Sequence, residues 1–497
     1  MSNIPYLSVL IALPIAVSLA LLAVPAANER LVRLVALTGT GVVFAWTVLL
    51  LTLYRPGGGM QFVEDYPWVP VIGMRYHLGM DGLSLPLVFL AALLPLLCVI
   101  YAWRQDTQPK TFFFLIALLQ VGMIGVFLAL DYVLFYIFWE IVLVPMFFLI
   151  NIWGGERRRY AAVKFFIFTL AGSVVMLLGI LLLWFNGPAV RTFDVLALAR
   201  FGQAGGYPVP LQMWVFAALF LGFAVKVPIF PFHTWLPDAH VEAPTVGSVL
   251  LAGVLLKMGG YGFLRMSLPT LPDAFKLGWG TALAVLGVIN IVYGAALALT
   301  QKDLKKMVAY SSIGHMGFVV LGIAAATPAG VDGAAMQMFT HGIITGMLFL
   351  LVGMIYERYH TKELAKLRGL MTEVPTLSVV LVFASFASLG LPGLAGFVGE
   401  FLSLMGGFER FPYVAMFSVI GIVLTAAYFL RMLQQVVFSP RTPEVQIACS
   451  QPYDVRPNEM VALIPLMSFT LFLGVYPLPF LQILDPYAAY IAKILGV

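Results

Sequence analysis

Apolar stretches of about 20 residues, the length that crosses a bilayer as one α-helix, recur along nearly the whole chain. They restrict the fold more than any other feature of the sequence. Their continuity excludes an outer-membrane barrel, whose strands alternate polar and apolar residues. Apolar residues make up 61% of the chain and charged residues only 10%, which excludes a soluble enzyme.

We predict an all-α polytopic membrane protein with about fourteen transmembrane helices. Two long connections, 54–78 and 186–210, are rich in Pro, Gly and aromatic residues and are expected to cap one face of the bundle. The predicted spans lie at 4–26, 31–53, 79–103, 111–129, 131–152, 160–185, 211–233, 245–268, 276–299, 307–326, 333–357, 375–403, 411–437 and 459–482.

The two cysteines, Cys98 and Cys449, lie far apart and outside any Cys-x-x-Cys pattern. Thiolates therefore assemble no haem-attachment, iron–sulfur or structural zinc site, and we expect no cofactor and no metal in this chain. The formal charge of +5 is explained by basic loops on one membrane face. We accordingly expect no nucleic-acid partner.

Lys and Arg concentrate in the odd-numbered connections between the predicted spans. Examples are the runs 157–159 and 302–306. The positive-inside rule places these connections in the cytoplasm, so both termini should lie on the opposite side of the membrane.

Six ionisable residues fall inside the predicted spans, where a charge at the bilayer centre costs about 2.5–3.5 kcal/mol on insertion scales. Burial favours the neutral forms of Lys and Glu, whereas a nearby opposite charge favours their charged forms. A Lys whose partner Glu moves would therefore alternately hold and release a proton, and His is a natural link between such stations. We interpret the six as a candidate proton relay: Glu140, Lys226, Lys257, His315, His341 and Glu400.

Other polar positions have two interpretations. His341 fits a hydrogen-bonding strut between helices as well as a relay. His233 and His240 flank the seventh span and are either relay residues or ordinary end-of-helix residues. Four residues near predicted helix ends are explained by side chains reaching to the interface: Asp81, Asp131, Arg265 and Asp332.

Two of the spans should be interrupted near the middle of the membrane. Pro228 and Pro231 follow Lys226 in the seventh span, and a Gly- and Pro-rich stretch, 390–399, precedes Glu400 in the twelfth. Proline removes a backbone donor and clashes with the preceding turn, and the freed backbone groups then line polar, hydrated space. An ionisable residue beside such a break indicates a transport site.

The ionisable residues also recur at a nearly constant offset. Lys226 and Glu400 are 174 positions apart, as are Lys257 and Arg431, and Glu140 and His315 are 175 apart. Five helices per unit invert the second copy relative to the first. We therefore predict two inverted repeats, helices 4–8 in 111–268 and helices 9–13 in 269–440, flanked by 1–110 and 441–497.

Three segments resemble the proton-conducting, antiporter-like subunits of respiratory complex I, the NADH-quinone oxidoreductase, over nearly the whole chain. They are KVPIFPFHTWLPDAHVEAPTVGSVLLAGVLLKMGGYG (226–262), QKDLKKMVAYSSIGHMGF (301–318) and LGLPGLAGFVGEF (389–401). Two of the three large subunits of that family usually carry Lys at the twelfth-helix position. Because this chain has Glu400 at that position, it resembles the M-type branch, the bacterial counterpart of mitochondrial subunit four.

The resemblance implies a role for each candidate residue. Glu140 and Lys226 would form a charge pair, Lys257 a central station and Glu400 a terminal station, with His315 bridging the last two. The supporting residues would be His233, His240, His341 and Arg431.

It also implies a setting for the chain. Neighbours would be the L-type and N-type antiporter-like subunits, and FMN, iron–sulfur clusters and quinone would belong to partner subunits. The chain would lie in a bacterial inner membrane with both termini periplasmic. A long lateral helix, typical of the L type, is not expected after the last span.

The function implied is proton translocation driven by NADH oxidation and quinone reduction elsewhere in the complex. The alternatives are a subunit of a multisubunit Na⁺/H⁺ antiporter or membrane-bound hydrogenase, a non-conducting structural scaffold, and the quinone-reducing subunit. The scaffold alternative predicts that Glu140→Gln, Lys226→Ala and Lys257→Ala assemble and pump normally.

Overall fold

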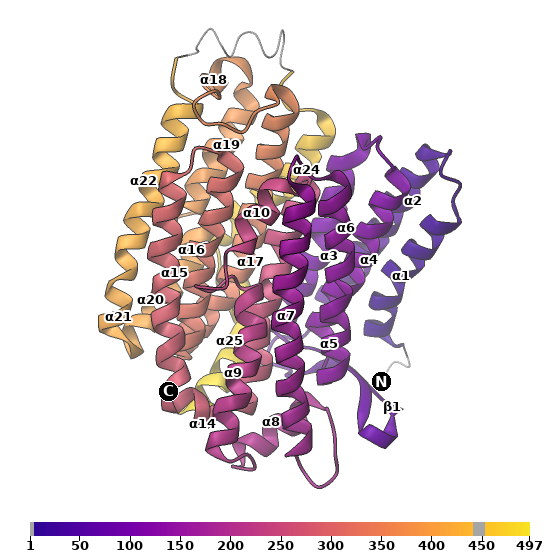
Figure 1. Ribbon diagram of the computed structural model, residues 1–497, viewed down its shortest axis with the longest axis vertical. Coiled ribbons are helices and arrows are strands. Elements are labelled where there is room, and N and C mark those ends of the chain that lie inside the picture. Colours follow the sequence, from indigo (N-terminus) through magenta and orange to yellow (C-terminus); the bar gives the residue numbers. More distant parts are fainter. Residues whose placement is uncertain (1–3, 441–452) are drawn as a thin grey trace.

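The computed structural model of the chain describes residues 4–440 and 453–497 and consists of long helices that run side by side along one axis (Figure 1). Within these residues, 13 helices are long and apolar enough to cross a membrane, and a shorter apolar helix, α19 (Pro375–Ser388), joins them. This confirms the predicted all-α polytopic fold.

The N-terminal part pairs four helices with one hairpin. The hairpin is antiparallel, with Tyr66 opposite Tyr76, and it occupies the connection 54–78 that we expected to cap the bundle. The elements are α1 (Tyr6–Ala23), α2 (Glu29–Leu53), β1 (Gln61–Val69), η1 (Pro70–Ile72), β2 (Met74–Met80), α3 (Ser84–Tyr101), η2 (Ala102–Arg104) and α4 (Pro109–Leu128).

The next elements form the fifth to eighth spans. The fifth is kinked where Pro145 denies the helix a backbone donor. The eighth contains two π-helical stretches, η3 and η4. The elements are α5 (Tyr132–Ile141), α6 (Leu143–Trp153), α7 (Arg158–Phe185), α8 (Val195–Gln203), α9 (Val209–Lys226), α10 (Trp235–Glu242), α11 (Thr245–Leu250), η3 (Leu251–Leu255), α12 (Leu256–Gly262), η4 (Phe263–Ser267) and α13 (Leu268–Thr270).

The remaining elements form the ninth and later spans. They are α14 (Pro272–Ala274), η5 (Phe275–Trp279), α15 (Gly280–Thr300), α16 (Leu304–Ala325), α17 (Pro328–Tyr359), α18 (Leu370–Glu373), α19, α20 (Ala395–Arg410), α21 (Pro412–Met416), α22 (Ser418–Val436), α24 (Pro457–Val475) and α25 (Leu478–Leu495).

Both predicted breaks are present. Residues 227–234 separate α9 from α10, and residues 389–394 separate α19 from α20. In the first break, the side chain of Asn290 on α15 accepts from the Phe230 N–H at 2.8 Å and donates to the Pro228 carbonyl at 3.0 Å. A fully buried amide thus satisfies backbone groups that the break releases from the helix.

The most buried helices lie in the middle of the bundle. The apolar windows of α17 and of the eighth span are entirely buried, and that of α16 is 94% buried, against 28% for α2 and 33% for α22. The spans that carry Lys257, His315 and His341 are therefore shielded from lipid by the outer helices.

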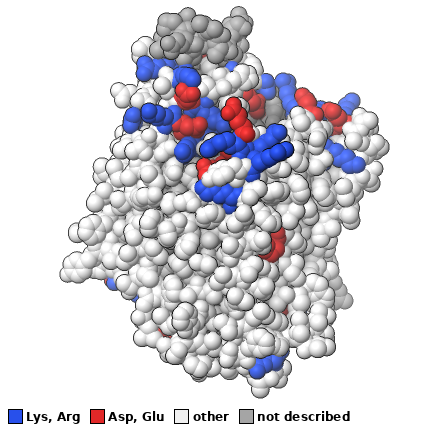
Figure 2. Space-filling view, viewed as in Figure 1, with Lys and Arg blue, Asp and Glu red and all other residues white. Residues whose placement is uncertain are grey.

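On the face shown in Figure 2, charged side chains gather near one end of the molecule, and the middle of this face is almost free of them. The basic end holds the connections that we expected to be cytoplasmic, such as 157–159 and 302–306. Both termini lie toward the other end (Figure 1). The two faces of the bundle therefore differ in charge as the positive-inside rule requires.

Three details of the sequence prediction are wrong. The seventh span continues beyond residue 233 to Glu242, because α10 resumes the helix after the break. The fourteenth ends at Val475, and a separate helix, α25, follows Pro477. Asp81 and Arg265 do not reach the interface, because they form a buried ion pair whose side chains are 9% and 5% exposed.

Candidate functional site

The six candidate residues come from six different elements, α5, α9, α12, α16, α17 and α20. Five of them are buried, and Glu140 is half-buried. The structure therefore removes most of these groups from lipid, as an ionisable side chain at membrane depth requires.

Lys226 is the last residue of α9 and stands directly before the break. Its Nζ lies 5.1 Å from the ring centroid of Trp139, over the face of the indole, which is a cation–π arrangement. Glu140, the next residue along α5, attracts the same ammonium. The expected acidic and basic partners, on α5 and α9, thus interact electrostatically.

Lys257 lies on a short α-helical segment between the π-helical stretches η3 and η4. Its Nζ donates to the carbonyl of Ala252, which belongs to η3. The same Nζ lies 2.7 Å from Nδ1 of His341 on α17. π-Helical turns are uncommon and often occur at functional sites, and here they flank a fully buried lysine.

A second hydrogen-bonded group continues from this point. His315 on α16 lies beside His341, with 5.6 Å between the ring centroids. Nδ1 of His315 is 2.7 Å from Oε1 of Glu400, and its Nε2 is 3.1 Å from the Ser388 hydroxyl. Gln337 donates to the same Glu400 oxygen at 3.3 Å. Lys257, His341, His315 and Glu400 therefore form one row, which we call the central row.

A small cavity lies between the two histidines. Its volume of about 10 Å³ is roughly the least that holds one water molecule. Two polar atoms in its lining residues, Nε2 of His341 and Oγ1 of Thr345, have no hydrogen-bond partner among the described residues. Since buried polar groups are normally partnered, the gap suits one bridging water.

The structure places the other predicted residues differently. His240 is fully buried, stacks on Phe349 with 4.6 Å between ring centroids, and interacts electrostatically with Lys257. His233 is buried at the seventh-helix break, beside Tyr293 at 5.2 Å. Arg431 is exposed on α22 and donates to the Leu299 carbonyl. The structure thus does not bring Arg431 to the central row.

Sequence reasoning missed three neutral members of the site: Gln337, Thr345 and Ser388. Each is a single polar residue within an apolar run, and most such residues in membrane helices only bond between helices. Their distinguishing feature is that they line the cavity together with His315, His341 and Glu400, which only the fold reveals. Among the described residues, no group of three or more His, Cys, Asp or Glu could hold a metal ion.

Comparison with known proteins gives consistent matches. The family model described as "NADH:quinone oxidoreductase/Mrp antiporter, TM" matches residues 129–425. The chain is 44% identical to the NADH-quinone oxidoreductase subunit M of Rhodobacter capsulatus, over 98% of this chain and 96% of that protein.

Solved structures also match. A chain of respiratory complex I from Thermus thermophilus with bound NADH superposes with a TM-score of 0.90 at 31% identity, covering 99% of this chain and 100% of that one. A chain of the Mrp complex from Dietzia sp. superposes with a TM-score of 0.88 at 20% identity, covering 100% of both chains, and shares the fold.

Proposed function

Because the chain belongs to the antiporter-like membrane subunits of NADH-quinone oxidoreductase, respiratory complex I, in the branch of subunit M, we propose that its buried ionisable residues carry protons across the membrane. The chain is a multi-pass membrane protein and a subunit of that enzyme. The proposal concerns what its own residues do within it.

The observation that carries the proposal is the continuity of the central row. Lys257 and His341 are joined by a 2.7 Å contact, and His315 and Glu400 by another. The gap between the two pairs has room for one water. A proton therefore meets a titratable group or a water site at each step from the eighth helix to the twelfth.

We propose that Glu140 and Lys226 control this row. A charge change in a neighbouring subunit alters the attraction between Glu140 and Lys226, and Lys226 then changes how readily Lys257 holds its proton. Glu140 suits this role because its side chain is only half-buried and can be reached by a neighbouring subunit, whereas the Lys226 side chain is buried.

The energy needed to move a proton across the membrane is comparable to the electrostatic interaction between neighbouring stations. Moving one charge across a membrane costs about 2.3 kcal/mol per 100 mV. Charges separated by a few ångströms interact by a few kcal/mol at an effective dielectric constant near 20. Electrostatic coupling between successive stations is thus large enough to drive a proton step.

The energy source and the environment belong to the same proposal. NADH oxidation and quinone reduction on partner subunits, which hold FMN, iron–sulfur clusters and quinone, drive the steps. The L-type and N-type subunits flank this chain. It lies in a bacterial inner membrane with its basic end in the cytoplasm and both termini periplasmic, since positive loops stay inside.

The test uses inverted membrane vesicles that contain the whole complex, with NADH oxidation and vesicle acidification measured together. Glu400→Gln and Lys226→Met should lower acidification strongly while assembled complex remains. Glu409→Gln is the matched control, because Glu409 is exposed on the same helix as Glu400. Normal acidification in the first two variants would support the scaffold alternative. Acidification that depends on Na⁺ would support the antiporter alternative, whose fold the Dietzia chain shares.

A further inference from the structure

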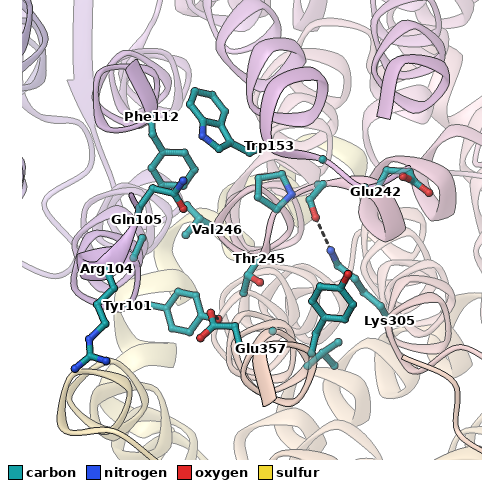
Figure 3. A pocket seen from close by; sticks show the side chains of 18 of the residues that line it. Tyr101, Arg104, Gln105, Phe112, Trp153, Glu242, Thr245, Val246, Lys305 and Glu357 are labelled. Carbon is teal, nitrogen blue, oxygen red and sulfur yellow. Dashed lines mark hydrogen bonds between the residues drawn. The ribbon is translucent and has the colours of Figure 1, made fainter. Parts of the chain in front are cut away.

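A large cavity opens at the basic end of the bundle (Figure 3). Its volume is about 620 Å³, which is room for many water molecules, since each occupies roughly 30 Å³ in the liquid. Its lining includes residues of the connections that follow α3, α6, α10 and α17. Its lining is strongly charged: Arg104, Asp106, Glu242, Lys305, Glu357, Lys362 and Arg456.

Lys305 occupies a distinct place in that lining. Lys305, in the first turn of α16, is 6% exposed, whereas the other charged groups of the lining are partly or fully exposed. Its Nζ donates to the carbonyl of Ala243, directly after α10 (Figure 3). Lys305 thus borders both the cavity and the packed interior of the bundle.

His240 lies in the last turn of α10, three residues before the Ala243 carbonyl that Lys305 binds. His240 is fully buried, and neither of its ring nitrogens has a hydrogen-bond partner within the described part of the chain. It interacts electrostatically with both Lys305 and Lys257. It also interacts with His341, the partner of Lys257. The buried imidazole therefore interacts both with a residue that lines the cavity and with two residues of the central row.

We propose that Lys305 is the entry residue of this subunit, which takes protons from water in the basic-end cavity and passes them through His240 to Lys257. The inference rests on the function proposed above. In each cycle the Lys305 ammonium gives its proton to an imidazole nitrogen of His240. His240 gives a proton to the Lys257 amine, and a hydronium ion that enters the cavity from bulk solvent reprotonates Lys305 and becomes water. One proton moves from the cavity to the central row, and no other group changes.

Two features favour Lys305 over the other groups around the cavity. Glu357 accepts a hydrogen bond from Tyr101 at 2.6 Å, and the Glu242 carboxylate accepts from the backbone N–H of Arg157 at 2.9 Å. Both carboxylates are therefore bound at the rim. Lys305 binds a carbonyl that cannot take up a proton, which leaves its proton available for transfer to a titratable neighbour such as His240.

The competing interpretation is that Lys305 only fastens α16 to the end of α10. Three variants separate the two roles. Lys305→Arg keeps the charge and the reach to the Ala243 carbonyl, but guanidinium is not deprotonated in proteins. Lys305→His is too short to keep that bond but titrates near neutral pH. Lys305→Met removes both properties.

The experiment measures NADH-driven acidification of inverted vesicles, divided by the amount of assembled complex. We expect the acidification rate of Lys305→Met and Lys305→Arg to fall at least tenfold, since a lost proton-transfer group typically costs about 10²–10⁴ in rate. Lys305→His should keep more activity than Lys305→Arg. Lys302→Met is the control, because Lys302 is exposed in the preceding connection.

The order of the variants decides the outcome. If Lys305→Arg acidifies like the parent while Lys305→His fails, Lys305 is a fastening residue and the inference is overturned. Normal acidification in all three variants overturns it too. A parallel Lys257→Met variant separates the two proposals: if it fails while the Lys305 variants pump normally, only the entry route is wrong. If all of them pump normally, the relay itself is refuted.

Discussion

Filling the small cavity between the histidines should stop proton transfer without disturbing the rest of the subunit. Ala387 on α19 lines that cavity, whose volume is about 10 Å³. Valine adds two methyl carbons, which leaves no room for a water molecule. His341 and His315, with 5.6 Å between ring centroids, would then lose their bridge. We expect Ala387→Val to reduce acidification at least tenfold, which corresponds to about 1.4 kcal/mol in the barrier.

The matched control is Ala384→Val, one turn earlier on the same helix. Both alanines are fully buried, so both substitutions carry a similar overpacking cost of about 1–3 kcal/mol, but Ala384 does not line the cavity. Thr345→Val is a milder probe, because it keeps the shape and removes one hydroxyl. The loss of one hydrogen bond, about 0.5–1.5 kcal/mol, predicts a decrease of roughly two- to tenfold.

The assay is NADH-driven acidification of inverted vesicles, followed with a pH-sensitive dye and divided by the amount of assembled complex. Heavy-water solvent should slow the parent enzyme and Ala384→Val alike. Equal rates for Ala387→Val and Ala384→Val would show that protons do not cross this gap, and the single-water bridge would be refuted.

Three further results are expected. Arg358→Met removes the cation that pairs with the Glu459 carboxylate, which is 2% exposed. The substitution should therefore destabilise the folded subunit by about 3–5 kcal/mol and reduce the amount of assembled complex. The double variant with Glu459→Met should restore assembly. In Gly399→Ala, the added Cβ would lie 2.7 Å from the backbone nitrogen of Gln337, so α20 and Glu400 must shift and the acidification rate should fall. Gly41→Ala is the control, because a Cβ added there meets open space. Asp454→Ala should lower thermal stability by about 0.5–2 kcal/mol at neutral pH. Partial burial raises the pKa of the Asp454 carboxyl, but hydrogen bonds from Thr376 and Leu377 lower it, and the net shift is downward. The stability that the Asp454 carboxylate contributes is therefore fully present above its unfolded pKa. It disappears as the pH falls through the folded pKa. Melting curves at neutral and acidic pH measure the difference.

Helix number and helix breaks were predictable from the sequence because their causes are local. Apolar runs and the positions of Pro228 and Pro231 identify the spans and the first break without any tertiary information. Lys257 and Glu400 were recognisable because a charge in an apolar run is costly and therefore rare. These features depend on neighbouring residues only.

The remainder of the site depends on distant segments that meet in space. Thr345 and Ser388 are ordinary polar residues until α17 and α19 place them at one cavity. Lys305 was counted as part of a basic connection, yet α16 begins at Leu304 and draws its side chain inward. Pattern reasoning along one chain cannot detect such convergence.

The offset of 174 residues shows the limit of matching positions by number. Lys226 ends the helix before its break, whereas Glu400 lies in the helix after its break. The equal offset therefore does not superpose the two breaks. The inverted repeat remains a prediction, and structural superposition of 111–268 on 269–440 is the direct check.

The number of protons moved per electron pair in the Lys257→Met complex addresses the central question directly. Lys257 is fully buried, and methionine keeps a side chain of similar length without an ionisable group. If protons pass through the central row, proteoliposomes with the Lys257→Met complex should move fewer protons per electron pair than proteoliposomes with an equal amount of the assembled parent complex. An unchanged ratio at an unchanged rate of NADH oxidation would contradict it.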